Sequence, residues 1–292
     1  MSERTQARPA EPESGGGPPE GGTVPPTAPR RAARRQKLLS PWLTTPVLVV
    51  LFIVAWKVYV EFFDVSEFVL PPPEVIGVAL VEALQDPQIW EHTGITLVET
   101  VVGFGIALVG GVAIGAILGK IAWLDQMFRP VVVALQVVPK VALVPLFVMW
   151  FGFGMTSKIV IAAVLAFFPV VTNTLLGVKS VSRGHLDVMT TLNASRWQTF
   201  RQVEFPSAAP YVLAGMEMGI VFATIGAVVG EFLGGSAGLG FRAVAALNGL
   251  QVETLFAVVT ILTVMGLLLY ALVVSLRRYL IPWHESVRGS DS

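Results

Sequence analysis

The chain has 292 residues, of which 54% are hydrophobic and 14% are charged, and its formal net charge is zero. A soluble domain carries about 25% charged residues, so this composition, with a mean hydropathy of +0.71, predicts a membrane protein. The absence of cysteine excludes disulfides, thiolate zinc sites and cysteine nucleophiles. Three histidines also argue against a histidine-built metal or catalytic site.

The N-terminal segment differs in kind from the rest. Residues 1–29 are rich in proline and glycine, and a basic run follows at 30–37. Such a segment buries too little apolar surface to offset its ordering entropy. We therefore expect residues 1–40 to form a disordered cytoplasmic tail whose basic run sets the topology, or else contacts anionic lipid headgroups.

Six apolar stretches are long enough to cross a bilayer, which takes about 20 residues of helix. They are 43–62, 97–119, 131–151 (interrupted by Pro139 and Pro145), 159–178, 211–233 and 255–276. The sequence thus predicts an all-α membrane protein with six transmembrane helices.

The distribution of positive charge predicts the orientation. Residues 61–97 contain seven acidic residues and no Lys or Arg, so this loop should lie outside. Most of the 20 Lys and Arg residues fall in the tail, in the alternate loops and near the C-terminus. Both termini are therefore expected in the cytoplasm. The expected organisation is a tail at 1–40, a first transmembrane helix at 41–64, an extracytoplasmic loop at 65–92, a core at 93–280 with a cytoplasmic loop at 179–210, and a C-terminal tail at 281–292.

Local patterns add two expectations about helices. Pro73 suits the first turn of a short surface helix whose apolar face would carry Val75, Val78, Ala79 and Leu84. Glycines spaced by four predict close helix contacts in the second and fifth spans. These glycines are Gly111, Gly115 and Gly119, and then Gly215, Gly219, Gly226, Gly230 and Gly234.

The cytoplasmic loop 179–210 is patterned like two short helices. Leu186, Met189 and Asn193 have helical spacing, and Ser195 is a plausible N-cap for a second helix that Pro206 would end. Its apolar side chains would have nothing to cover them in water, which suits insertion into a groove of a partner protein.

This loop resembles the cytoplasmic signature of binding-protein-dependent ABC permeases, E-A-A, three residues, G, nine residues, I-x-L-P. Asp187 stands at the Glu position, Asn193 at the Gly, and Pro206 at the Pro, while Val188 and Met189 replace both alanines. The segments around Pro139-Lys140, Gly226–Glu231 and Leu70-Pro71 resemble the subgroup that imports nitrate, sulfonates, taurine and pyrimidine precursors.

The resemblance implies a type I ABC importer permease fold and a non-catalytic subunit of the bacterial inner membrane. ATP and Mg would bind a partner ATPase dimer, an extracytoplasmic binding protein would deliver the solute, and a second permease, most simply a second copy, would complete the pathway. The residues implied in coupling to the ATPase are Asp187, Leu192, Asn193, Ala194, Ser195, Trp197, Phe200 and Pro206.

Ionisable residues inside spans point to function or to buried pairing. Lys140 follows a helix-breaking proline and could attract an anionic solute, or pair locally beside the broken helix. Glu231 could belong to an outer gate or be a paired structural carboxylate. Phe168 could line the pathway or belong to the packed core.

Other function classes fit the sequence less well. An ion-coupled secondary transporter predicts internal repeats and mid-membrane carboxylates, and no repeat is evident. A membrane enzyme needs a cluster of catalytic side chains, which is missing. An ABC permease for another solute, such as an amino acid, stays open.

Overall fold

The computed structural model describes residues 41–281, so the predictions for residues 1–40 and 282–292 lie outside the described residues. No β-strand occurs within the described range, which confirms the all-α class. The elements are α1 (Pro41–Phe62), α2 (Pro73–Gln85), α3 (Pro87–Lys120), α4 (Ala122–Val137), η1 (Lys140–Leu143), α5 (Val144–Phe151), α6 (Met155–Lys179), α7 (Arg183–Thr191), α8 (Arg196–Thr199), η2 (Phe200–Glu204), α9 (Phe205–Gly234), α10 (Leu239–Asn248) and α11 (Val252–Leu280).

The chain divides into two units, residues 1–51 and 52–292. Of the first unit the structure describes the start of α1, where the side chains from Val47 to Leu51 are all more than half exposed. Such exposure suits a helix face in contact with lipid. Within the second unit, the rest of α1 reaches α11 and α2, because the ring of Trp56 lies 6.1 Å from that of Phe256 and Lys57 Nζ lies 2.9 Å from Glu74 Oε1.

Four helical segments in the described range are long and apolar enough to cross a membrane: Pro87–Lys120, Met155–Lys179, Arg196–Gly234 and Val252–Arg277. A fifth span results if α4 and the η1–α5 segment count as one broken span. Membrane-spanning helices are thus present, while six spans and the cytoplasmic placement of both termini stay predictions.

The stretch 131–151 is not one continuous helix, as its two prolines lead us to expect. The axis bends by 81° between α4 and the η1–α5 segment. Pro139 lacks an amide proton and disfavours helical geometry at Val138, whose ψ is 127°. The chain restarts as the short 3-10 helix η1, which begins at Lys140.

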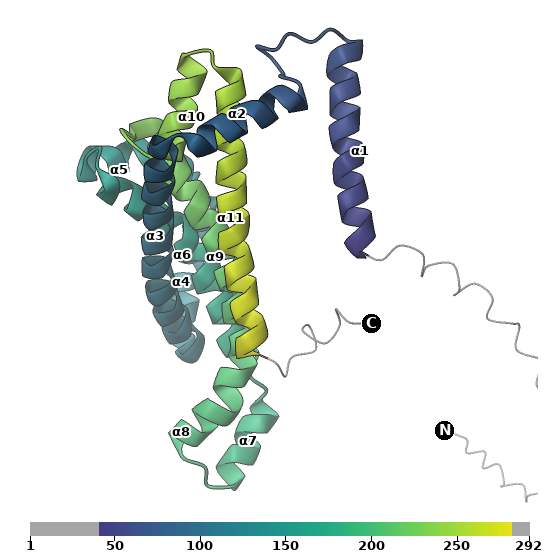
Figure 1. Cartoon of the computed structure of the whole chain (residues 1–292). Helices are drawn as coiled ribbons and strands as arrows, with labels where there is room; N and C mark the ends of the chain where they lie inside the picture. The colour runs from purple at the N-terminus through teal and green to yellow at the C-terminus, as the bar shows by residue number, and fades with distance from the viewer. Residues whose placement is uncertain (1–40, 282–292) are drawn as a thin grey trace, which may run out of the picture. The chain divides into compact units, whose positions relative to one another are not determined.

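Helix α6 packs between α3 and α9, and glycines set the approach of the backbones. A Cβ atom on Gly103 would lie 2.6 Å from Ala162 Cβ, and one on Gly226 would lie 2.6 Å from Ala162 Cα. Ala162 is fully buried between the two. Further along α3, Gly111 and Gly115 face Val170 and Thr174 of α6 in the same way. The predicted close contacts are confirmed (Figure 1).

The surface helix α2 begins at Pro73, as expected, but the prediction of its buried face is wrong. Ile76 and Ala79 are buried, whereas Val78 is 59% and Leu84 41% exposed. Ala79 and its neighbours Leu80 and Ala83 face the core beside α11. The expected face started from Val75, whereas the buried face starts from Ile76. The two faces therefore differ by about one residue position around the helix.

Candidate functional site

A cavity of about 460 Å³ opens where the α4–η1 break meets the middle of α6 and α9. Lys140 and Phe168 both line it, so the structure brings together two side chains that are 28 positions apart. Lys140 Nζ lies 4.8 Å from the centre of the Phe168 ring. This is a cation–π contact, which orients the ammonium group without neutralising its charge.

The hydrogen bonds around Lys140 leave its charge without a counter-ion. Its Nζ donates to the Gln136 carbonyl at 3.3 Å, and Gln136 Nε2 donates to Thr172 Oγ1 at 2.8 Å. Within residues 41–281 no carboxylate forms an ion pair with Lys140. The remaining wall from α9 is apolar, with Met218, Phe222 and Ile225. The cavity therefore offers one cation, a few amide and hydroxyl groups, and aromatic and aliphatic surface.

Glu231 does not line this cavity. It belongs to a buried polar network near the C-terminal end of α9. Its Oε1 accepts a hydrogen bond from Thr96 Oγ1 at 2.6 Å, and its Oε2 accepts one from the Gly240 amide at 2.6 Å. Thr96 Oγ1 in turn accepts from the Leu239 amide at 2.8 Å, and His92 Nδ1 accepts from the Gly238 amide at 2.9 Å. The network joins α3, α9 and the start of α10.

The start of α10 is a suitable partner for the Glu231 carboxylate, because unpaired amides and the helix dipole favour an anion there. Gly238 has φ 103°, and a Cβ atom on it would lie 1.9 Å from Glu231 Oε1. Glycine is thus needed at this position both for its backbone angle and for space. Glu99 and Lys158 are buried near this carboxylate as well, at 1% and 3% exposure.

The predicted coupling loop forms a helical projection at one end of the bundle, opposite the end that carries α2, α5 and α10 (Figure 1). Leu192 is 70% and Trp197 67% exposed, and the Trp197 ring stacks on Phe200 at 5.6 Å between centres. Asp187 also lies exposed on α7. These side chains have the exposure that a docking surface for a partner requires.

Local capping explains the turn between α7 and α8. Asn193 adopts φ 53°, a left-handed conformation that asparagine tolerates better than most residues. The Ala194 amide then donates to the Met189 carbonyl at 3.0 Å. Ser195 caps α8 through a reciprocal pair with Gln198, in which Ser195 Oγ accepts from the Gln198 amide and Gln198 Oε1 accepts from the Ser195 amide.

The second helix does not end at Pro206, contrary to expectation. Helix α8 continues through the π-helical segment η2 into α9, and Pro206 lies in the first turn of α9. The missing amide of Pro206 falls directly after the π-helical turn, in which the Phe205 amide donates to the Phe200 carbonyl and the regular α-helical pattern is already interrupted. The projection is therefore continuous with a membrane-spanning helix.

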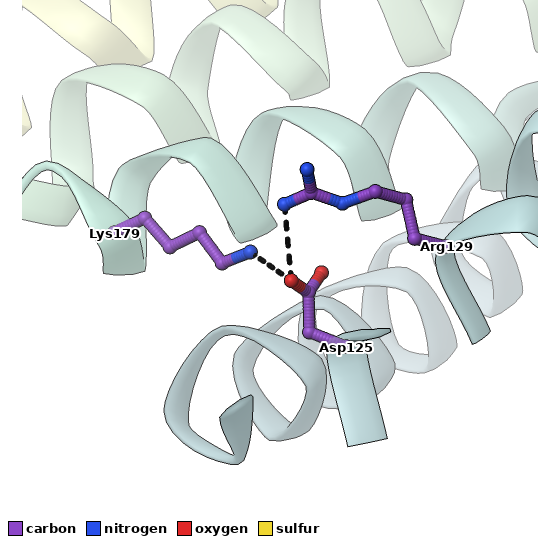
Figure 2. Close-up of polar contacts among 3 residues, drawn as sticks. All are labelled: Asp125, Arg129 and Lys179. Carbon is purple, nitrogen blue, oxygen red and sulfur yellow. Dashed lines mark hydrogen bonds and ion pairs between the residues drawn. The ribbon is translucent and has the colours of Figure 1, made fainter. Parts of the chain in front are cut away.

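Ion pairs fix the base of the projection on both sides. Lys120, the last residue of α3, lies 2.7 Å from Glu204 of η2. Asp125 of α4 accepts from Arg129 Nη2 at 3.0 Å and from Lys179, the last residue of α6 (Figure 2). The Asp125 side chain is only 8% exposed, so water solvates its charge poorly. The two cations compensate that charge instead. Asp125 and Lys179 do not stand out as partners in the sequence, because no local pattern joins positions 54 apart.

Comparison with known proteins finds a matching family and several relatives. The profile of the family described as binding-protein-dependent transport system inner membrane component matches residues 111–285. The riboflavin transport system permease protein of Chloroflexus aurantiacus is 36% identical over 84% of this chain and 92% of its own length. The formylaminopyrimidine transport permease protein of Halalkalibacterium halodurans is 30% identical over 80% and 93%, and the aliphatic sulfonates transport permease protein of Bacillus subtilis is 32% identical over 85% and 90%.

A solved structure shares the fold. The crystal structure of an amino acid ABC transporter with histidines superposes with a TM-score of 0.54 at 18% identity, and covers 66% of this chain and 94% of the other.

Proposed function

The chain belongs to the family of inner-membrane components of binding-protein-dependent transport systems, and on this basis we propose that it carries a small anionic or planar heterocyclic solute inward. The observation that carries the proposal is the Lys140 ammonium group, which faces the cavity over the Phe168 ring without a carboxylate partner among residues 41–281. A cation of this kind attracts a sulfonate, carboxylate or other oxyanion.

The walls of the cavity support the same class of solute. Phe168 and Phe222 provide aromatic surface against which a planar ring can stack, and Gln136 and Asn173 provide amide groups for hydrogen bonds. The relatives named for riboflavin and formylaminopyrimidine transport suggest a ring, and the one named for aliphatic sulfonates suggests an anion. A small planar ring that carries negative charge meets both demands.

The energy source in this proposal is a separate ATPase dimer, which binds ATP and Mg. Its groove receives the exposed Leu192 and Trp197 at the projection formed by α7 and α8. A solute-binding protein delivers the solute to the opposite face, and a second copy of the chain supplies the other half of the pathway. Both termini and the projection lie in the cytoplasm, as the distribution of basic residues indicates.

Reconstituted transport tests the role of Lys140. Vesicles containing the permease, its ATPase and its binding protein should take up solute when ATP is enclosed on the ATPase side. Lys140→Met should lower uptake of an anionic solute about tenfold or more, because a charge-assisted hydrogen bond contributes about 1.5–3 kcal/mol. Lys57→Met, which removes a lysine outside the cavity, is the matched control.

Two outcomes would contradict the proposal. Uptake by Lys140→Met with unchanged rate and affinity would remove the direct role of the ammonium group. Uptake that follows a proton gradient and persists without the ATPase would replace the importer by an ion-coupled transporter.

A further inference from the structure

A second cavity, of about 700 Å³, lies at the end of the bundle that carries the α7–α8 projection. It is bounded by the ends of α3 and α6, the start of α9, α7 and η2. Its volume falls within the usual range for small-molecule sites. Nothing in the proposed transport pathway uses it, since it shares no lining residue with the cavity around Lys140.

The lining is apolar except at a few positions. Aliphatic and aromatic side chains make up most of the wall, and the polar side chains are Lys120, Thr174, Lys179, Arg183 and Glu204. Lys120 and Lys179 are the last residues of α3 and α6. Lysines at the ends of spans lie where the membrane meets water. The cavity therefore extends from the level of the lipid headgroups toward the apolar interior.

The charges at its mouth are unbalanced toward positive. Lys120 pairs with Glu204 at 2.7 Å, and Lys179 pairs with Asp125. Arg183 is exposed at the start of α7, and no ion pair forms on it within residues 41–281. With Asp125 beside Lys179 included, the mouth combines three cations with two carboxylates, and Arg183 carries the excess positive charge.

Thr174, the one uncharged polar side chain of the lining, does not open into the cavity. It is 1% exposed and lies against α3, where a Cβ atom on Gly115 would lie 2.7 Å from Thr174 Cβ. The interior of the cavity therefore presents an apolar surface.

We propose that this cavity binds one anionic phospholipid. Arg183 holds the phosphate at the mouth, with the ion-paired Lys120 and Lys179 beside it, and an acyl chain fills the apolar interior. Leu186 of α7 and Phe200 of η2 belong to the same wall, so the lipid contacts the projection that carries the coupling surface. The π-helical geometry of η2 fits this assignment, because such segments occur frequently at functional sites.

Native mass spectrometry of the whole chain tests the proposal. The protein is reconstituted in vesicles of equal parts phosphatidylcholine and phosphatidylglycerol and then released for analysis. Bound phosphatidylglycerol is expected on the unmodified chain. Ala116→Phe, which fills the cavity, should remove it, whereas Ala113→Phe, an exposed position on the same helix outside the lining, should not.

A charge variant provides a second readout that does not depend on packing. Arg183→Gln should lower the preference for phosphatidylglycerol over phosphatidylcholine about fivefold, the contribution of one cation near a membrane surface. Arg196→Gln, which removes an exposed arginine outside the lining, should leave the preference unchanged.

Three results would overturn the proposal. The first is an equal amount of bound lipid on the unmodified chain and on Ala116→Phe. The second is equal retention of both lipids. The third is a lipid adduct that forms after deletion of residues 1–37 and is absent from the full chain. That result would mean that the N-terminal segment, and not a lipid, occupies the cavity in the full chain. Bound lipid is measured without solute or ATP, so these results are independent of the transport function.

Discussion

The contact between α6 and α9 at Gly226 leads to a quantitative prediction. A Cβ atom on Gly226 would lie 2.6 Å from Ala162 Cα, 3.0 Å from Ala162 N and 3.1 Å from the Ile161 carbonyl oxygen. All three neighbours are backbone atoms, so no side chain can rotate away. Ordinary carbon contacts are about 3.5–4.0 Å, so Gly226→Ala requires the helices to separate by about 1 Å.

The expected cost follows from that displacement. Inserting a methyl group into a closely packed core costs about 1–3 kcal/mol, and backbone contacts place this site in the upper part of that range. One kcal/mol lowers the melting temperature of a domain of this size by about 2–4 °C. We therefore expect Gly226→Ala to lower the melting temperature by about 4–10 °C in detergent, as followed by tryptophan fluorescence.

Gly105→Ala is the matched control, because no atom lies within 4 Å of the Cβ that it would add. Alanine is a better helix former than glycine by about 1 kcal/mol, so this control should hold or raise the melting temperature. If Gly226→Ala and Gly105→Ala melt within one degree of each other, the reasoning from backbone contact is refuted.

Substitutions at three further positions test other features. Glu231→Ala leaves the Gly240 amide buried without an acceptor, so we expect a loss of about 1–3 kcal/mol of stability. Glu231→Gln keeps an acceptor and should lose less in the same thermal assay. Asn193→Gly should preserve both the melting temperature and the solute-stimulated ATP hydrolysis of the complex, since glycine adopts φ 53° freely. Asn193→Val should lose about 1–3 kcal/mol of stability from backbone strain. Equal stability of the two variants would contradict the turn geometry. Asp125→Asn leaves Lys179 without a carboxylate and should reduce ATP-driven uptake more than it reduces basal ATP hydrolysis, and parallel loss of both would show that Asp125 only stabilises the fold.

Local signals in the sequence predict several elements well. The spacing of the glycines on α3 and α9 predicts the close contacts, because packing in a bilayer depends on small residues on one helix face. Ser195 is correctly predicted as a cap, since capping involves neighbours three positions away. Pro139 predicts an interruption, although the resulting bend of 81° depends on how the next segment packs.

Contacts between distant positions account for what the sequence did not reveal. Glu231 and Thr96 are 135 positions apart, and no local pattern pairs them. Glu99 reads as the polar start of a span, but α3 begins at Pro87, twelve residues earlier, and places Glu99 inside the bundle. The π-helical segment η2 is likewise hidden, because no residue pattern in Phe200–Glu204 marks a change from α-helical to π-helical bonding.

The continuity of α8, η2 and α9 has a mechanical consequence. The helical segment Arg196–Gly234 contains 39 residues, which corresponds to about 58 Å at a rise of 1.5 Å per residue. One end carries Trp197 on the exposed projection, and Met218 and Phe222 in its middle form a wall of the cavity around Lys140. Because no loop interrupts this rod, a tilt imposed at the projection would displace that wall directly, and the width of the cavity would follow the motion of whatever protein holds the projection.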